Sequence, residues 1–158
     1  MFRSMRRHNQ QVTQEECLRI LGSSMRGVLA VLGDDGYPYT VPLDFLYDES
    51  DGRIYFHGAG EGHKIDAIER CDKVSFCVLG NGVSKHGDWA LHITSVVAFG
   101  RIRKVTDRMK TLDRVRRLGL KYNPSAEDVD RELEQAKERV LCLEMEIEHI
   151  TGKLVHEK

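Results

Sequence analysis

Apolar and β-branched runs separated by aspartate- and glycine-rich turns dominate the middle of this chain. The runs that we expect to form strands are 28–32, 37–47, 53–57, 74–79, 89–104 and 141–148. The turns Asp34-Asp35-Gly36 and 48–52 are too short for a crossover, so the strands beside them must be antiparallel neighbours. Because strands and helices do not alternate regularly, the pattern predicts a mainly β protein with a six-stranded antiparallel barrel or sandwich.

Helices are expected only around this strand region. Thr13-Gln14-Glu15-Glu16 matches a capping box and predicts a helix that Gly22 ends or weakens. Further helices are expected at 63–68, from 106 to about 122, and from 125 to about 137. The second expected strand contains Pro38 and Pro42, which predicts that it lies at a sheet edge or carries a bulge.

Length and composition exclude several classes of protein. The 158 residues suit one domain, 1–158, and 24 basic against 25 acidic residues give a net charge of 24 − 25 = −1. No apolar run approaches the ~18 residues of a membrane span, and the start lacks the apolar stretch of a secretory signal. Four scattered cysteines without a CxxC pair suggest reduced core residues rather than disulfides or a metal site. We therefore expect a cytoplasmic protein with no metal and no membrane partner.

The segment 101–121 is strongly basic, with nine lysines and arginines against two aspartates. Such a segment can be a nucleic-acid patch, or a solvated helix that pairs with the acidic segment following it. The near-neutral total charge favours ion pairing, so no nucleic-acid partner is expected.

The stretch 55–64 is the most informative for chemistry. A strand ends, Gly58, Gly60 and Gly62 follow, and a helix begins at His63-Lys64. Glycines allow close approach to a ligand, and a helix N-terminus attracts phosphate. The spacing is not that of a Walker A loop, and a plain strand-to-helix turn is the alternative.

Four motifs in series link the chain to a known family. They are Gly36-x-Pro38-Tyr39-x-Val41-Pro42-Leu43, Ile54-Tyr55-Phe56-His57-Gly58-Ala59-x-x-Gly62-x-Lys64, Ser95-Val96-Val97-Ala98-Phe99-Gly100, and Ile147-Glu148-x-x-Thr151-Gly152-Lys153. In this order they resemble the flavin-binding split-barrel superfamily. Within it, the chain is most similar to the nitroimidazole-resistance branch of the pyridoxamine-phosphate-oxidase-like proteins, over nearly its whole length.

The resemblance implies a six-stranded, Greek-key split barrel with flanking helices and a homodimer that holds FMN at the subunit interface. FAD is the alternative cofactor, since it shares the phosphate-bearing half. The ring would lie along the backbone of Thr40, Val41, Pro42 and Leu43. The phosphate would be held by the turn residues His57, Gly58, Ala59, Gly62, His63 and Lys64. His63 stands where better-known oxidases have arginine, so phosphate affinity is expected to fall with rising pH.

Two side chains have more than one interpretation. His57 either acts in catalysis beside the cofactor or only hydrogen-bonds at the end of the barrel. Trp89, the only tryptophan, either stacks on the flavin or belongs to the core. His86 and His92 lack partners at a recognised metal-ligand spacing.

The resemblance implies a flavin-dependent oxidoreductase that passes electrons from NAD(P)H to a small planar substrate, including nitro compounds. The alternative is a non-catalytic protein that binds or sequesters flavin or haem. Oxidation of pyridoxamine phosphate is not expected, because the C-terminal signature of the true vitamin B6 oxidases has no counterpart here.

Overall fold

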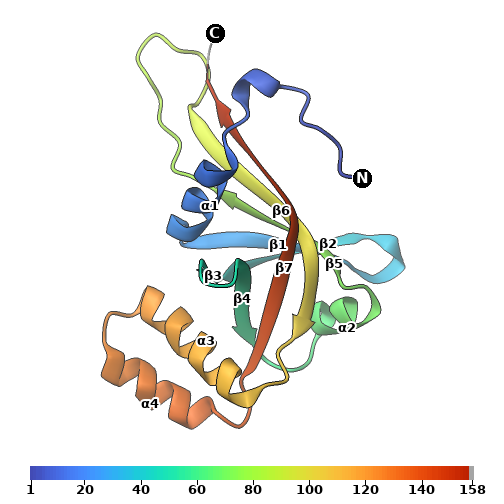
Figure 1. Ribbon diagram of the computed structural model, residues 1–158, viewed down its shortest axis with the longest axis vertical. Coiled ribbons are helices and arrows are strands. Elements are labelled where there is room, and N and C mark those ends of the chain that lie inside the picture. The colour runs from blue at the N-terminus through green and yellow to red at the C-terminus, as the bar shows by residue number, and fades with distance from the viewer. Residues whose placement is uncertain (157–158) are drawn as a thin grey trace.

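The computed structural model describes residues 1–156 (Figure 1). Its centre is a single antiparallel sheet of seven strands in the order β2-β1-β5-β6-β7-β4-β3. The strands are β1 (Arg26–Leu32), β2 (Pro38–Asp44), β3 (Leu46–Asp48), β4 (Arg53–Gly58), β5 (Lys73–Leu79), β6 (Ile93–Lys104) and β7 (Leu141–Val155). The predicted mainly β class, the antiparallel pairing and the flanking helices are confirmed.

The expected strand 37–47 is divided in two, which is why seven strands are found instead of six. It separates at Phe45 into β2 and β3, and these two strands occupy opposite edges of the sheet. One residue spans less than about 4 Å, so the sheet must curl until its two edges meet near Phe45. The result is a barrel that is split beside this residue.

The corner at Phe45 is stabilised by a helix far along the chain. Tyr122 accepts a hydrogen bond from the Phe45 amide at 2.9 Å, and its hydroxyl lies 2.5 Å from the Met25 carbonyl oxygen. Lys121 Nζ donates to the carbonyl oxygens of Ser24 at 2.6 Å and Phe45 at 2.9 Å. Backbone groups that leave the strand ladder are thereby paired inside the protein.

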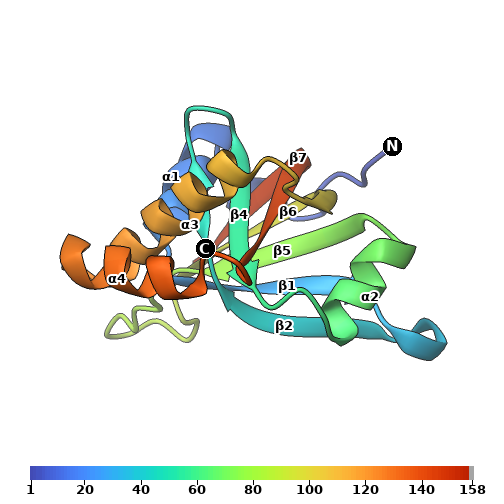
Figure 2. The ribbon, with the colours of Figure 1, turned by 90° about the horizontal axis from the view of Figure 1, so that it is seen from below.

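Four helices flank the sheet: α1 (Gln14–Ser23), α2 (His63–Arg70), α3 (Arg108–Tyr122) and α4 (Ala126–Ala136). The Thr13 side chain caps α1 by accepting from the Glu16 amide, but the Glu16 carboxylate binds Arg19 instead of completing the capping box. Figure 2 shows α3 and α4 side by side at one end of the barrel, with α2 at the other. In the described part of the chain, no helix combines the length and apolar character needed to cross a membrane.

The barrel interior is filled by aromatic and branched side chains. Phe76 packs edge-to-face with Phe45 and Phe56, at centroid distances of 4.8 and 5.1 Å. Leu29 and Met145 are fully buried around them. This core holds the ends of β2 and β4 in fixed positions.

Ion pairs, rather than free charge, characterise the basic segment 101–121. Its pairs with the acidic segment are Arg101–Glu148, Arg103–Glu144, Lys110–Glu144 and Arg116–Asp130, all at 2.9 Å or less. The buried carboxylate of Asp48 binds Arg117 at 2.5 Å and Arg114 at 3.1 Å. The predicted pairing with the acidic segment is confirmed, and further pairs reach the β3 end.

Candidate functional site

The turn from β4 to α2 is shaped to approach a ligand closely. Gly62 is the N-cap residue of α2 and has φ 110°, a conformation that side-chain-bearing residues rarely adopt. Its carbonyl accepts from the amides of Ile65 and Asp66. Within the described chain, the His63 and Lys64 amides have no backbone acceptor, so the first turn of α2 presents free donors.

Lys64 places an unpaired positive charge over this turn. A Cβ built on Gly58 would lie 3.5 Å from Lys64 Nζ, so the ammonium group stands directly over the glycine backbone. Burial lowers the pKa of Lys64, and among the described residues no carboxylate pairs with it. An unpaired, partly buried cation beside free amide donors favours an anionic ligand.

His57 is the last side chain of β4 before the glycine-rich turn and lies opposite Cys142 of β7. Burial lowers its pKa, and Lys64 adds to the effect while the charge of Asp44 opposes it. The side chain is exposed and borders a cavity, so it keeps contact with solvent. The imidazole is therefore neutral near pH 7 and can act as a donor at one nitrogen and an acceptor at the other.

Strand β2 is an edge strand, as its prolines predicted. The Gly33 amide donates to the Tyr37 carbonyl at 2.8 Å, and in this register the odd-numbered residues of β2 bond to β1. Pro38 and Pro42 are even-numbered, so their missing donors face the open edge. Two of the predicted ring-binding residues face that edge: Thr40 presents its amide and its carbonyl there, and Pro42 presents its carbonyl. The backbone groups of Val41 and Leu43 instead form hydrogen bonds with β1.

Both ends of β2 are associated with the β4–α2 turn. The ring of Tyr39 stacks on that of His63 with centroids 4.2 Å apart, and Asp44 interacts electrostatically with His57. The open edge of β2 and the glycine-rich turn therefore belong to one region of the surface.

His63 has partners of its own in this region. Its Nε2 lies 3.5 Å from the Asp34 carboxylate, which also binds Arg70 at 2.7 Å. The side chain is thus directed toward the β1–β2 hairpin, while its backbone amide faces outward at the start of α2.

Trp89 is 97% exposed and is not part of the core, so that alternative is wrong. It lies in the loop between β5 and β6, where His92 Nε2 is 2.5 Å from an Asp88 carboxylate oxygen. Among residues 1–156, no cluster of three or more potential metal ligands occurs.

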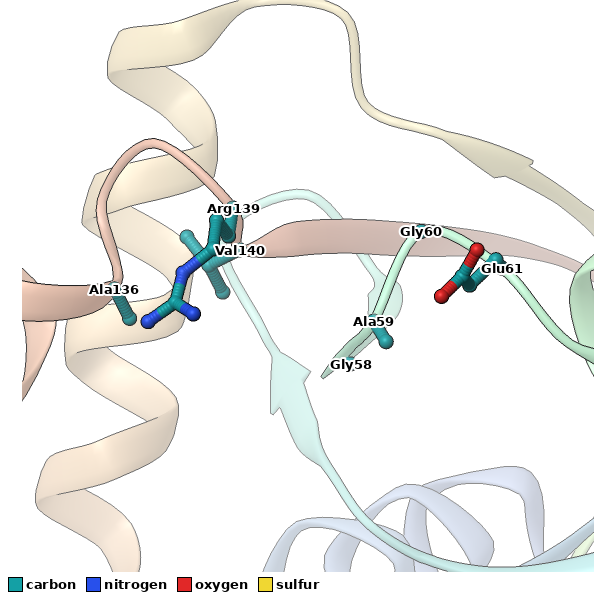
Figure 3. Close-up of a pocket in the computed structure, with 7 residues that line it drawn as sticks. All are labelled: Gly58, Ala59, Gly60, Glu61, Ala136, Arg139 and Val140. Atoms are coloured by element: carbon teal, nitrogen blue, oxygen red, sulfur yellow. The ribbon is translucent and has the colours of Figure 1, made fainter.

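Two adjoining cavities lie at the end of β4. The loop cavity, of about 550 Å³, is lined by Gly58, Ala59, Gly60, Glu61, Ala136, Arg139 and Val140 (Figure 3). The helix cavity, of about 340 Å³, is lined by His57, Val115, Gly119, Asn123, Asp128, Val129, Glu132, Leu133, Ala136 and Val140. Sequence reasoning missed the α3, α4 and β7 residues in both, because no local motif shows that 136–140 meets 58–61.

Comparison with known proteins gives a family and a fold. The model of the family described as "Pyridoxamine 5'-phosphate oxidase" matches residues 13–154. A comparison with curated proteins gave no match.

Several solved structures share the fold at low sequence identity. A candidate 5-nitroimidazole antibiotic resistance protein of Bacteroides thetaiotaomicron is similar with TM-score 0.76 and 19% identity, over 91% of this chain and 86% of that chain. An FAD-binding protein of Mesorhizobium loti has TM-score 0.65 and 20% identity, over 93% and 98%. An FAD and haem binding protein of Mycobacterium smegmatis has TM-score 0.68 and 17% identity, over 94% and 74%.

The family match covers almost all of the strands and helices that build the site, from α1 to β7. The split sheet and the glycine-rich turn agree with it. The chain therefore belongs to the pyridoxamine 5'-phosphate oxidase family of split-barrel proteins.

Proposed function

We propose that this protein is a flavin-dependent oxidoreductase that binds FMN and reduces small planar acceptors, including nitro compounds, with electrons from NAD(P)H. Flavin binding is supported by the family and by structural neighbours described as FAD-binding. The nitro acceptor is supported by the neighbour described as a candidate nitroimidazole resistance protein.

The observation that carries the proposal is the unpaired ammonium group of Lys64 over the backbone of Gly58. A phosphate at this turn would meet the free amides of His63 and Lys64 together with that charge. The open edge of β2 at Thr40 offers an alternating donor and acceptor, which suits the polar edge of a planar ring. The residues present therefore fit a flavin nucleotide.

When bound, the flavin supplies the chemistry of hydride and electron transfer. The contribution of this chain is to hold and orient. Lys64 and the α2 amides bind the phosphate, and Thr40 fixes the ring along β2. His57, neutral near pH 7, holds a proton at one ring nitrogen where it can donate a hydrogen bond to an acceptor's oxygen.

We also propose that two copies of the chain pair through the outer face of the sheet and enclose the flavin between them. Val28, Leu32, Leu79 and Phe99 are exposed on this face, at 37%, 50%, 62% and 38%. The face borders the open edge of β2, so a second copy would cover the ring site. Trp89 is exposed enough to reach a partner's site.

We propose a cytoplasmic location, because the free cysteines suit a reducing compartment.

A non-catalytic flavin- or haem-binding protein is the alternative. Steady-state consumption of NAD(P)H with a nitro compound separates the two, because a carrier takes up its chromophore without turnover. The test uses protein loaded with FMN and, as a control, the same protein without it. Sustained oxidation of NAD(P)H that depends on both FMN and acceptor supports the enzyme, and its absence from fully loaded protein contradicts it.

A further inference from the structure

Arg139 lies on the turn between α4 and β7, where its backbone amide donates to the Ala136 carbonyl at 2.8 Å. Its guanidinium group is exposed and has neither an ion pair nor a hydrogen bond among residues 1–156. Within residues 13–156 every other arginine has a carboxylate or carbonyl partner. Those arginines are Arg19, Arg26, Arg53, Arg70, Arg101, Arg103, Arg108, Arg114, Arg116, Arg117 and Arg131.

The unpaired group lines the loop cavity opposite the glycine-rich turn. Figure 3 shows the Arg139 side chain beside Ala136, on the far side of the cavity from Ala59 and Gly60. Lys64 stands over Gly58, which lines the same cavity. Two unpaired cations from distant parts of the chain thus flank one short stretch of glycine-rich backbone.

The charge of a bound phosphate gives a reason for the second cation. A phosphate monoester carries about −1.5 to −2 charges at pH 7, and Lys64 supplies one positive charge. The ring of His63, the neighbouring candidate, is directed at Asp34. A guanidinium group can donate two parallel hydrogen bonds to a phosphate, which an imidazole cannot do.

Glu61 also lines the loop cavity and opposes an anion there. Its carboxylate has no cation partner among the described residues, so it is free to turn toward solvent. Removing its charge should therefore strengthen phosphate binding, so a Glu61 variant should change the affinity in the opposite direction to an Arg139 variant.

We propose that Arg139 is a second phosphate-binding residue, which reaches from the α4–β7 turn to the phosphoryl group of the flavin nucleotide held at Gly58 and Lys64. The inference rests on the proposed function and adds a residue that neither the turn motif nor the helix start contains. It makes α4 part of the cofactor site, since the end of this helix sets the position of Arg139.

The test compares flavins with and without phosphate. The full chain, freed of chromophore, is titrated with riboflavin, FMN and FAD while flavin fluorescence is followed. Arg139→Gln should weaken FMN and FAD binding about 10- to 100-fold and leave riboflavin binding unchanged. Arg139→Lys should restore part of the affinity, and Glu61→Gln should raise it.

Arg131→Gln is the matched control, because this α4 arginine is exposed and pairs with Asp128. It should change none of the three affinities. Unchanged thermal unfolding of each variant shows that the fold is intact. Equal losses for FMN and FAD are expected, because both carry the phosphate held at Gly58, and a loss confined to FAD would contradict this placement.

Two results would overturn the inference and are distinguishable. The first is that Arg139→Gln binds FMN and FAD as tightly as the unaltered chain, or loses as much affinity for riboflavin as for FMN. Either outcome excludes a phosphate-binding role for Arg139 and leaves the proposed function unaffected. Failure of the unaltered chain to bind FMN or FAD overturns the proposed function and the inference together.

Discussion

Lys121 on α3 donates a hydrogen bond to the carbonyl oxygen of Phe45 at 2.9 Å and lies 3.9 Å from the centre of the Phe45 ring. Phe45 is the one residue between the two edge strands of the sheet. A helix that follows β6 in sequence therefore stabilises the place where the barrel is split. Since β2 ends directly before this residue, the contact also supports the candidate flavin site.

Replacing Lys121 should destabilise the fold. Lys121→Met leaves the Ser24 and Phe45 carbonyls without their ammonium donor, and we expect a loss of about 1–3 kcal/mol in the free energy of unfolding. Urea denaturation measures it. Lys137→Met, which removes an exposed pair with Glu134, should cost less than about 0.5 kcal/mol. Equal effects of the two variants would contradict a special role for the Phe45 corner.

The same lysine should give the stability a pH dependence. Burial lowers the pKa of Lys121 to about 8. An unfolded lysine titrates near 10.4, so between about pH 8 and 10 the unfolded chain holds more protons than the folded one. The stability contribution of this group is least below pH 8 and rises with pH across that window. Unfolding measured at steps between about pH 7.5 and 9.5 should show this rise in the unaltered chain and not in Lys121→Met. Parallel curves would exclude Lys121 as its source.

Lys64 should matter more for cofactor binding than its neighbour. Lys64→Gln removes the unpaired charge over Gly58, and we expect FMN affinity to fall about 10- to 100-fold with riboflavin affinity unchanged. His63→Gln should have a smaller effect, because the ring is directed at Asp34. A fluorescence titration from about pH 5.5 to 8.5 also tests whether phosphate binding weakens with rising pH, as the histidine in place of arginine predicts. A larger loss from His63→Gln than from Lys64→Gln would reverse this assignment.

His57 should affect turnover rather than binding. His57→Phe keeps a ring at the end of β4 but removes the proton-carrying nitrogens, so we expect FMN affinity to change little and turnover to fall about 100-fold. Because burial lowers the pKa of His57, its ionisation should appear in the pH profile of turnover below about 6.5 and vanish in the variant. Unchanged turnover with the same profile would leave His57 a structural hydrogen-bonding group.

Local signals predicted much of the architecture. Prolines at 38 and 42 placed their strand at an edge, and Thr13 marked the start of α1. The glycines of the β4–α2 turn predicted that turn, and Gly62 adopts φ 110°, a conformation that other residues rarely adopt. Each of these features depends on interactions within a few residues, so the sequence alone was enough to predict it.

Long-range contacts could not be predicted in this way. The expected strand 37–47 is divided at Phe45, where the backbone is bound by Lys121 and Tyr122. These residues lie 76 and 77 positions after Phe45 in the sequence. Glu16 prefers Arg19 to the Thr13 amide, which a capping box does not reveal. Arg139 lines the same cavity as the glycine-rich turn only because the fold brings the α4–β7 turn to the end of β4, so no motif marks it.

Flavin binding is tested directly by the absorbance spectrum of the purified chain, recorded before and after incubation with FMN and with FAD. Heat release and chromatography then identify the chromophore. If the chain binds flavin, the spectrum shows the near-ultraviolet and visible bands of oxidised flavin, and heating releases an intact flavin nucleotide. A colourless protein that takes up neither nucleotide would contradict flavin binding, and a haem spectrum would require the histidines to be reinterpreted as iron ligands.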